Sequence, residues 1–165
     1  MGTGGVVLRR IRSSWSDEPT GFRWVLEGRL AGSGYPASRS QVLWVKGKGF
    51  SDILTLTEKP LPREWVDGSG LEVKHVPMVD HEPPSQESLS ESVGFLNEEI
   101  GSGRAVLVHC LAGQGRTMCV IGAYLMKSTG ASTEDVLKRL RAIRPGAVEL
   151  RQEESLRRFA SSLSN

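Results

Sequence analysis

Residues 106–117 read VLVHCLAGQGRT, and this stretch decides the fold of the 165-residue chain. Its first three residues form an apolar run, which is typical of a central strand covered on both faces. Glycines follow at positions 113 and 115, and residues 117–126 are apolar on nearly every side. Such a segment is typical of a buried helix. The stretch is therefore predicted to be a strand, a glycine-rich turn and a helix.

Further strands and helices alternate outward from this stretch. Period-two patterns predict strands over 23–31, 52–57 and 71–78, with the central strand over 104–109. Apolar stripes predict helices over 85–100, over 117–126, after Ser132 and over 149–163. The order predicts an α/β fold: a central mixed, mostly parallel sheet of four to five strands flanked by helices. A phosphate-binding loop is expected between the last central strand and the buried helix.

Composition places the chain among one-domain globular proteins. It has 38% apolar and 24% charged residues and a formal net charge of +2. The two cysteines, Cys110 and Cys119, form neither a zinc motif nor a disulfide scaffold, so no metal and no cofactor are expected. No block of like charge indicates nucleic-acid binding, and no apolar stretch approaches the roughly 18 residues that span a bilayer. We expect a cytoplasmic protein; the sequence does not indicate its oligomeric state.

The loop after the central strand has the features of an anion-binding site. Gly113 and Gly115 allow positive φ angles, so successive backbone N–H groups can turn inward. The start of the next helix adds unpaired N–H groups, and Arg116 offers a planar fork that matches two phosphoryl oxygens. Such a nest stabilises a thiolate, so we expect Cys110 to be an ionised nucleophile near neutral pH. The Thr117 hydroxyl can donate a hydrogen bond to that sulfur.

Other interpretations of the loop fit less well. A Walker-type loop needs lysine before its Ser or Thr, and here Arg116 precedes Thr117. A purely structural turn, with Cys110 as a small buried residue, is the remaining alternative.

His109, Cys110, Arg116 and Thr117 match the pattern H-C-x5-R-[ST]. The chain thereby resembles the cysteine-dependent protein tyrosine phosphatase superfamily, and more closely its small atypical dual-specificity phosphatases. Segments 24–32, 56–58 and 141–146 extend the likeness over about residues 22–160. The resemblance implies that residues 1–21 are an N-terminal extension or extra edge strand and that 22–165 form one catalytic domain. It also implies a phosphate-binding loop of Leu111, Ala112, Gly113, Gln114, Gly115 and Arg116, supported by His109 and Thr117.

Phosphate-ester hydrolysis also needs a proton for the leaving oxygen. Asp80 is the candidate, because it lies between a predicted strand and a predicted helix, thirty residues before Cys110. The family's general acid lies in such a loop at about that separation. A helix cap is the structural alternative for Asp80, and His81 or Glu82 would substitute if the loop were shifted. The resemblance also places a polar group near the attacking water, and Glu149, Gln152 and Glu153 are equally eligible.

The resemblance implies a protein phosphatase that hydrolyses phosphotyrosine and phosphoserine/threonine through a cysteinyl-phosphate. Its expected partners are phosphorylated proteins. Two alternatives stay open: the same chemistry on a nucleotide, RNA 5′ end or inositol phosphate, and a non-catalytic phosphate-binding module. Leu111 and Gln114 are uncharged, which disfavours a polyanionic lipid as the substrate.

Two further residues of the predicted helix are of interest. Met118 stands where the family usually has a small residue, which leaves open how closely the helix approaches the sheet. Cys119 is expected to pack in the core, and a redox pair with Cys110 is the alternative.

Overall fold

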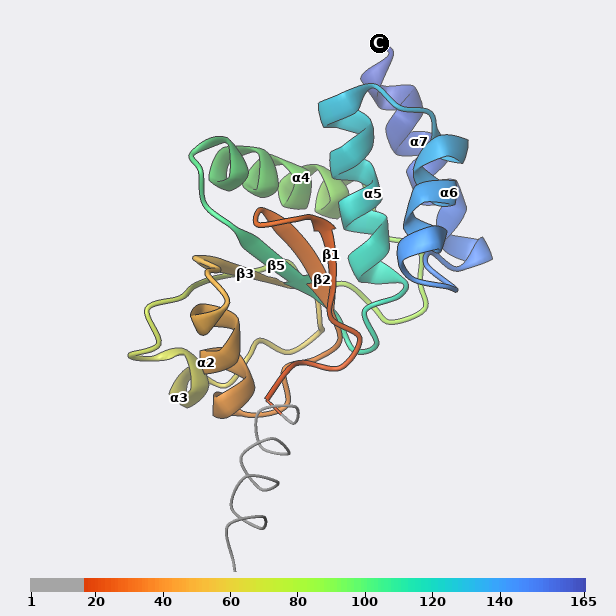
Figure 1. The fold of residues 1–165 in the computed structure, drawn as a ribbon. Coiled ribbons are helices and arrows are strands. Elements are labelled where there is room, and N and C mark those ends of the chain that lie inside the picture. Colours follow the sequence, from red (N-terminus) through yellow and green to blue (C-terminus); the bar gives the residue numbers. More distant parts are fainter. Residues whose placement is uncertain (1–16) are drawn as a thin grey trace, which may run out of the picture.

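The structure is a computed structural model that describes residues 17–165, and its centre is a five-stranded mixed sheet (Figure 1). The strand order is β1-β2-β5-β3-β4; β1 and β2 pair antiparallel and every other pair is parallel. This confirms the predicted mixed, mostly parallel sheet. The strands are β1 (Arg23–Leu26), β2 (Leu30–Ser33), β3 (Asp52–Thr55), β4 (Glu72–His75) and β5 (Val106–His109).

The prediction of one strand over 23–31 is wrong, because the segment folds back on itself as a hairpin. Gly28 has a φ of +75°, and the N–H of Arg29 donates to the carbonyl of Leu26 at 2.9 Å. A left-handed glycine in a tight turn reverses the chain, while apolar residues on both sides continue the period-two pattern through it. The other three predicted strands are present, each shorter than expected.

Helices cover both faces of the sheet (Figure 1). The four predicted helices lie together on one face, and the Ser85 and Ser132 side chains cap α4 and α6 as expected. The second face carries two helices that the sequence did not predict. The helices on the first face are α4 (Gln86–Gly101), α5 (Arg116–Thr129), α6 (Thr133–Ile143) and α7 (Leu150–Leu163). The helices on the second face are α2 (Arg39–Gly47) and α3 (Arg63–Val66).

Successive side chains of the central strands point to opposite faces of the sheet and pack into the two sides of the core. Ile53 and Leu107 pack with the α2 side, whereas Leu54, Val106 and Val108 pack with the α4–α7 side. All five are fully buried. The continuous apolar run of β5 is therefore explained by burial on both faces of the sheet.

Helix α5 comes close to the sheet even though it carries Met118. A Cβ added to Gly32 of β2 would lie 2.9 Å from the Thr117 Cγ2 and 3.3 Å from the Met118 Cε. Met118 is fully buried. The glycine on the strand thus provides the room that the larger helix residue takes up.

The candidate site lies where the parallel strands end. Strands β2, β3 and β5 run in the same direction, so the loops that follow them meet at one edge of the sheet. The loop after β4 joins them there, because β4 is parallel to β3. Of the predicted N-terminal extension, residues 1–16 lie outside the described residues, and 17–21 contain turns and no strand. Within 17–165 no helix has the length and apolar character needed to cross a membrane.

Candidate active site

Cys110 lies directly after β5, at the start of a tightly wound loop. Its side chain is buried, and its Sγ accepts a hydrogen bond from the N–H of Gly113 at 3.3 Å. Gly113 has a φ of +75°, and a Cβ there would lie 2.6 Å from the carbonyl carbon of Ser33. Only glycine fits this position, because both the backbone angle and the contact with the neighbouring strand exclude a side chain.

Arg116 is the first residue of α5, and its side chain lines the same pocket as Glu58 and Asp80. Its side chain is 1% exposed. Nη1 donates to the Glu58 carboxylate at 2.7 Å and to the Met78 carbonyl at 2.9 Å, and Nη2 lies 3.1 Å from the Asp80 carboxylate. Nε is buried with no partner among residues 17–165. A buried donor left unpaired is costly, so Nε is a candidate donor for a bound ligand.

Glu58 is the site residue that sequence reasoning missed. It follows β3 in the Leu56–Glu58 segment, and its carboxylate accepts from Nη1 of Arg116, whereas Asp80 lies beside Nη2. A backbone hydrogen bond at its own residue, together with the contact with Arg116, lowers the pKa of Glu58. Its charged carboxylate therefore helps to fix the guanidinium. The available signal was an acidic residue at the carboxyl end of a strand that neighbours the cysteine strand.

His109 supports the loop through the backbone. Its ring is fully buried, and desolvation lowers the pKa of His109 to about 4, so the imidazole is neutral at pH 7. Nδ1 lies 3.1 Å from the Cys110 carbonyl and Nε2 lies 2.9 Å from the Thr55 hydroxyl. A carbonyl can only accept, so Nδ1 carries the proton and Nε2 accepts from Thr55. The ring thereby holds the first peptide group of the loop.

The expected hydrogen bond from Thr117 to the sulfur is not formed. The Thr117 hydroxyl is buried and has no hydrogen-bond partner in the described part of the chain. Cys119, on α5, is also buried, and burial raises the pKa of its thiol. Both cysteines are free thiols. A redox pair between Cys110 and Cys119 stays a prediction.

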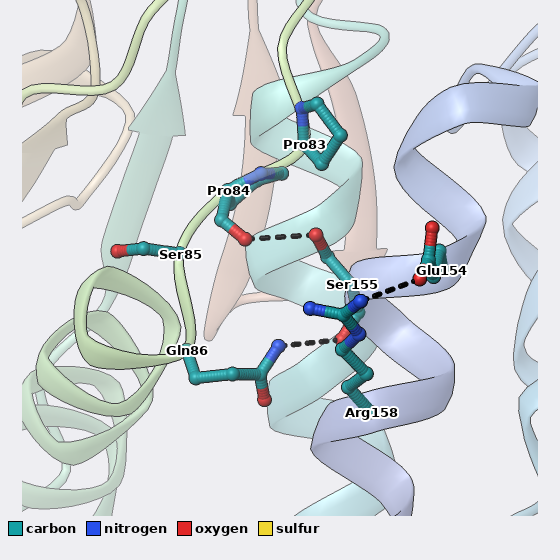
Figure 2. A pocket seen from close by; sticks show the side chains of 7 residues that line it. All are labelled: Pro83, Pro84, Ser85, Gln86, Glu154, Ser155 and Arg158. Atoms are coloured by element: carbon teal, nitrogen blue, oxygen red, sulfur yellow. Dashed lines mark hydrogen bonds and ion pairs between the residues drawn. The ribbon is translucent and has the colours of Figure 1, made fainter.

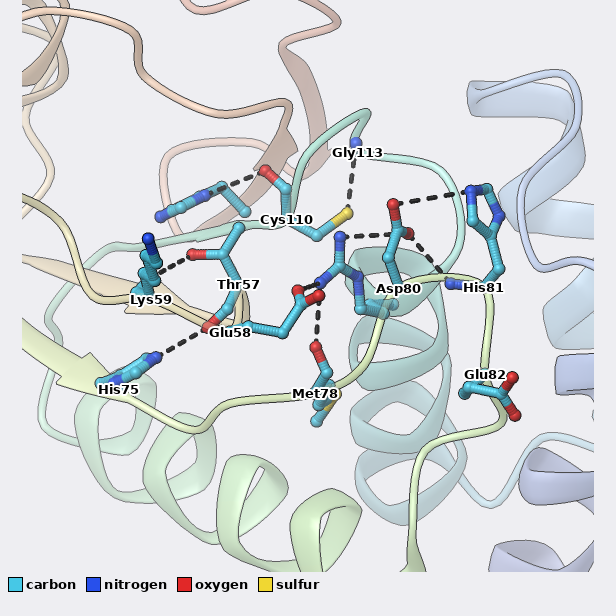
Figure 3. A network of polar contacts seen from close by, with 12 residues as sticks. Thr57, Glu58, Lys59, His75, Met78, Asp80, His81, Glu82, Cys110 and Gly113 are labelled. Carbon is cyan, nitrogen blue, oxygen red and sulfur yellow. Dashed lines mark hydrogen bonds and ion pairs between the residues drawn. The ribbon is translucent and has the colours of Figure 1, made fainter.

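Asp80 lies in the loop after β4, on the side of the loop that carries Cys110 (Figure 3), and it lines a pocket together with Arg116. One carboxylate oxygen accepts from the backbone N–H of His81 at 3.0 Å and lies beside Arg116. Glu82 instead pairs with Arg151 at 3.5 Å, outside this pocket. The structure therefore brings Asp80, and not Glu82, to the loop. The pocket measures about 390 Å³ and is lined by Tyr35, Thr57, Glu58, Lys59, Asp80, Leu111 and Arg116.

The outer side of the loop is held by the segment between α6 and α7. The Val148 N–H donates to the Gln114 carbonyl at 3.0 Å, and the Gln114 side chain donates to the Pro145 carbonyl at 3.1 Å. A Cβ on Gly115 would lie 2.7 Å from Oε1 of Gln152, which is buried against it. Of the three polar candidates at the start of α7, Gln152 is therefore the one against the loop.

The remaining members of the predicted loop take part mainly through their backbone. The carbonyl of Leu111 accepts from the Tyr35 N–H at 3.0 Å, and that of Ala112 accepts from Arg144 at 3.4 Å. The Leu111 side chain is 61% exposed. It thus forms part of the pocket mouth.

Comparison with known proteins identifies the family. The model for the family PTP-SAK, described as Swiss Army Knife protein, DSP-PTPase phosphatase domain, matches residues 19–157, and the chain belongs to this family. The crystal structure of Tk-PTP in the active form has a TM-score of 0.77 at 34% identity, covering 85% of this chain and 96% of that one.

Two curated relatives agree with this assignment. Dual specificity protein phosphatase 12 of Rattus norvegicus is 31% identical over 63% of this chain. Dual specificity protein phosphatase 1 of Arabidopsis thaliana is 34% identical over 73% of it. The matched part spans only 31% and 59% of these two relatives' own length.

Proposed function

We propose that residues 22–165 form a catalytic domain that hydrolyses phosphate monoesters of proteins, on phosphotyrosine and on phosphoserine/threonine. The observation that carries this proposal is the buried Cys110 Sγ, which accepts a hydrogen bond from the Gly113 N–H in a loop that ends at Arg116, whose buried Nε has no hydrogen-bond partner within residues 17–165. The family assignment supports the same chemistry. A cytoplasmic location fits it, because a reducing compartment keeps the nucleophile as a thiol.

The reaction proceeds in two displacements. The Cys110 thiolate attacks phosphorus in line, while Arg116 and the loop amides hold the three non-bridging oxygens. These donors are fixed in advance by the fold, so they stabilise charge as it redistributes in the transition state. Asp80 protonates the leaving oxygen, and the P–O bond breaks to leave a cysteinyl-phosphate. Water then attacks this phosphorus with Asp80 as base, which releases phosphate and restores the thiolate.

The pocket favours a single phosphate on an otherwise ordinary side chain. Two carboxylates, Glu58 and Asp80, line it together with the cations Lys59 and Arg116. Both carboxylates contact Arg116, so further phosphates near the first would meet negative charge. Tyr35 and Leu111 supply apolar walls that suit an amino-acid side chain better than a polyphosphate.

A substrate panel tests this choice. The alternative is a non-protein monoester, since PTPMT1, solved in complex with PI(5)P, shares the fold at a TM-score of 0.74 and 22% identity. Phosphotyrosine and phosphothreonine peptides, inositol phosphates and RNA 5′-triphosphate ends are compared by kcat/KM for phosphate release. We expect the peptides to be the best substrates. A clear preference for inositol phosphates or RNA ends would contradict the protein assignment.

Asp80→Asn is expected to lower kcat/KM by about 10²-fold on phenyl phosphate, whose leaving oxygen needs a proton. On 2,4-dinitrophenyl phosphate, whose leaving group departs without one, the loss should be small. Steady-state rates on the two esters measure the difference. Glu82→Gln is the matched control, because Glu82 lies in the same loop and pairs with Arg151. Equal losses on both esters would rule out proton donation by Asp80.

A further inference from the structure

Helix α7 holds the loop that carries Asp80 at three points along one side. Ser155 donates to the Pro84 carbonyl at 2.8 Å, and Gln152 donates to the Glu82 carbonyl at 3.4 Å. Glu149, at the start of the helix, lies 2.7 Å from Nδ1 of His81. Residues spaced by three share one side of a helix, so Glu149, Gln152 and Ser155 form one docking edge.

Ser155 and Pro84 also line a pocket of about 320 Å³ between the loop and α7 (Figure 2). Gln86 adds to this contact by donating to the Ser155 carbonyl at 3.0 Å. These neutral bonds anchor the proline-containing end of the loop. The contact between Glu149 and His81 is different, because it joins an imidazole to a carboxylate and lies next to Asp80.

Unusual backbone angles accompany this charged contact on both sides. His81 has a φ of +64° and Val148, directly before Glu149, has a φ of +60°. For a β-branched residue such as Val148 this angle is a genuine outlier, which persists only where surrounding contacts impose it. The Val148 N–H is held by the Gln114 carbonyl of the phosphate loop, and its carbonyl by Arg141. The position of Glu149 is therefore set by the phosphate loop itself.

His81 links Glu149 to Asp80 through its ring and its backbone. The backbone N–H of His81 donates to one Asp80 oxygen, and its ring Nε2 lies 3.5 Å from the other. We propose that His81 and Glu149 form a positioning pair, which holds the Asp80 carboxyl over the Cys110 loop. This inference rests on the proposed function, in which Asp80 transfers the proton. The Glu149 carboxylate balances the charge of the protonated His81 ring. The ring can therefore orient the Asp80 carboxyl without placing an unbalanced positive charge beside it.

The pair should weaken as pH rises. The charged groups facing the His81 ring are Glu149, Asp80 and, from α5, Arg116, whereas Glu82 pairs with Arg151. The hydrogen bond that the His81 ring donates to Glu149, together with the charges of Asp80 and Glu149, raises the pKa of His81 above its ordinary value. The charged pair is therefore complete below this raised pKa and is lost as pH increases through it.

A double-mutant cycle tests the pair. Glu149→Gln keeps the size of the side chain, and His81→Asn keeps a residue that tolerates a left-handed backbone. Each single variant should lower kcat/KM on phenyl phosphate by about threefold to fivefold, and the double variant by no more than either. On 2,4-dinitrophenyl phosphate all three should match the wild type. Additive losses, as expected if Glu149 acted directly on substrate, or equal losses on both esters, would overturn the pair.

A second measurement does not depend on activity. The chain has three histidines, so NMR titration of the His81 ring is resolvable in the intact protein. Glu149→Gln should lower the pKa of His81, whereas Glu154→Gln, which removes an exposed acid paired with Arg158, should leave it unchanged. An unchanged His81 titration in Glu149→Gln would overturn the pair even in an active enzyme. An inactive wild type that kept the titration difference would instead overturn the proposed function, and the role of Asp80 with it.

Discussion

Cys110→Ser is expected to lower kcat/KM for p-nitrophenyl phosphate by roughly 10⁴-fold or more. The loop that ends in Arg116 directs the Gly113 N–H at Sγ, and sulfur is a far stronger nucleophile than a serine hydroxyl. A serine hydroxyl stays protonated there, and the neighbouring His109 ring does not remove its proton, because this ring contacts the Cys110 carbonyl and Thr55. The substitution is small, so the loop amides and Arg116 should remain in place.

Binding should therefore survive the loss of turnover. We expect the Cys110→Ser variant to retain a phosphotyrosine peptide with a Kd close to the wild-type KM, measured by calorimetry. Cys119→Ala is the matched control, because Cys119 is the second buried cysteine and lies on the helix that follows the loop. It should keep nearly full activity. Comparable rates for wild type and Cys110→Ser would refute both enzyme hypotheses and favour the non-catalytic phosphate-binding module.

The centre of the fold was predictable because its signals are local. The apolar run of β5 and the glycines at 113 and 115 lie within one short stretch, and the apolar helix follows it directly. Burial on both faces and the left-handed turn are direct consequences of those residue types. Asp80 was proposed from its place between a strand and a helix together with the family resemblance, and its role as general acid stays a prediction.

The features that the sequence did not reveal depend on contacts between distant segments. Glu58 is a site residue only because β3 lies beside β5, which brings its carboxylate within 2.7 Å of Arg116. The contact between His81 and Glu149 likewise joins segments 68 residues apart. Helix α2 was missed because it is short and buries only Val42 and Val45, which is too little for a periodic pattern to stand out.

Arg116→Lys is expected to lower kcat/KM by about 10³-fold, although it conserves the charge. The guanidinium contacts the Glu58 carboxylate, the Met78 carbonyl and the Asp80 carboxylate at once, and its Nε has no hydrogen-bond partner in the described part of the chain. A lysine side chain has a single nitrogen, which cannot contact Glu58, Met78 and Asp80 at the same time. The loss should fall on kcat as well as KM, because the planar fork matches the phosphoryl group in the transition state.

A conservative exchange elsewhere in the sheet separates this effect from damage to the fold. Arg104 binds the fully buried Asp52 with two hydrogen bonds of 2.9 and 3.1 Å, just before β5 and at the opposite end of that strand from Cys110. Arg104→Lys also replaces a bidentate contact by a single nitrogen, so it should lower the melting temperature. Its kcat/KM, measured well below that temperature, should stay near the wild-type value. If Arg116→Lys lost no more activity than Arg104→Lys, the guanidinium would be structural, and the phosphate would have to be held by the loop amides alone.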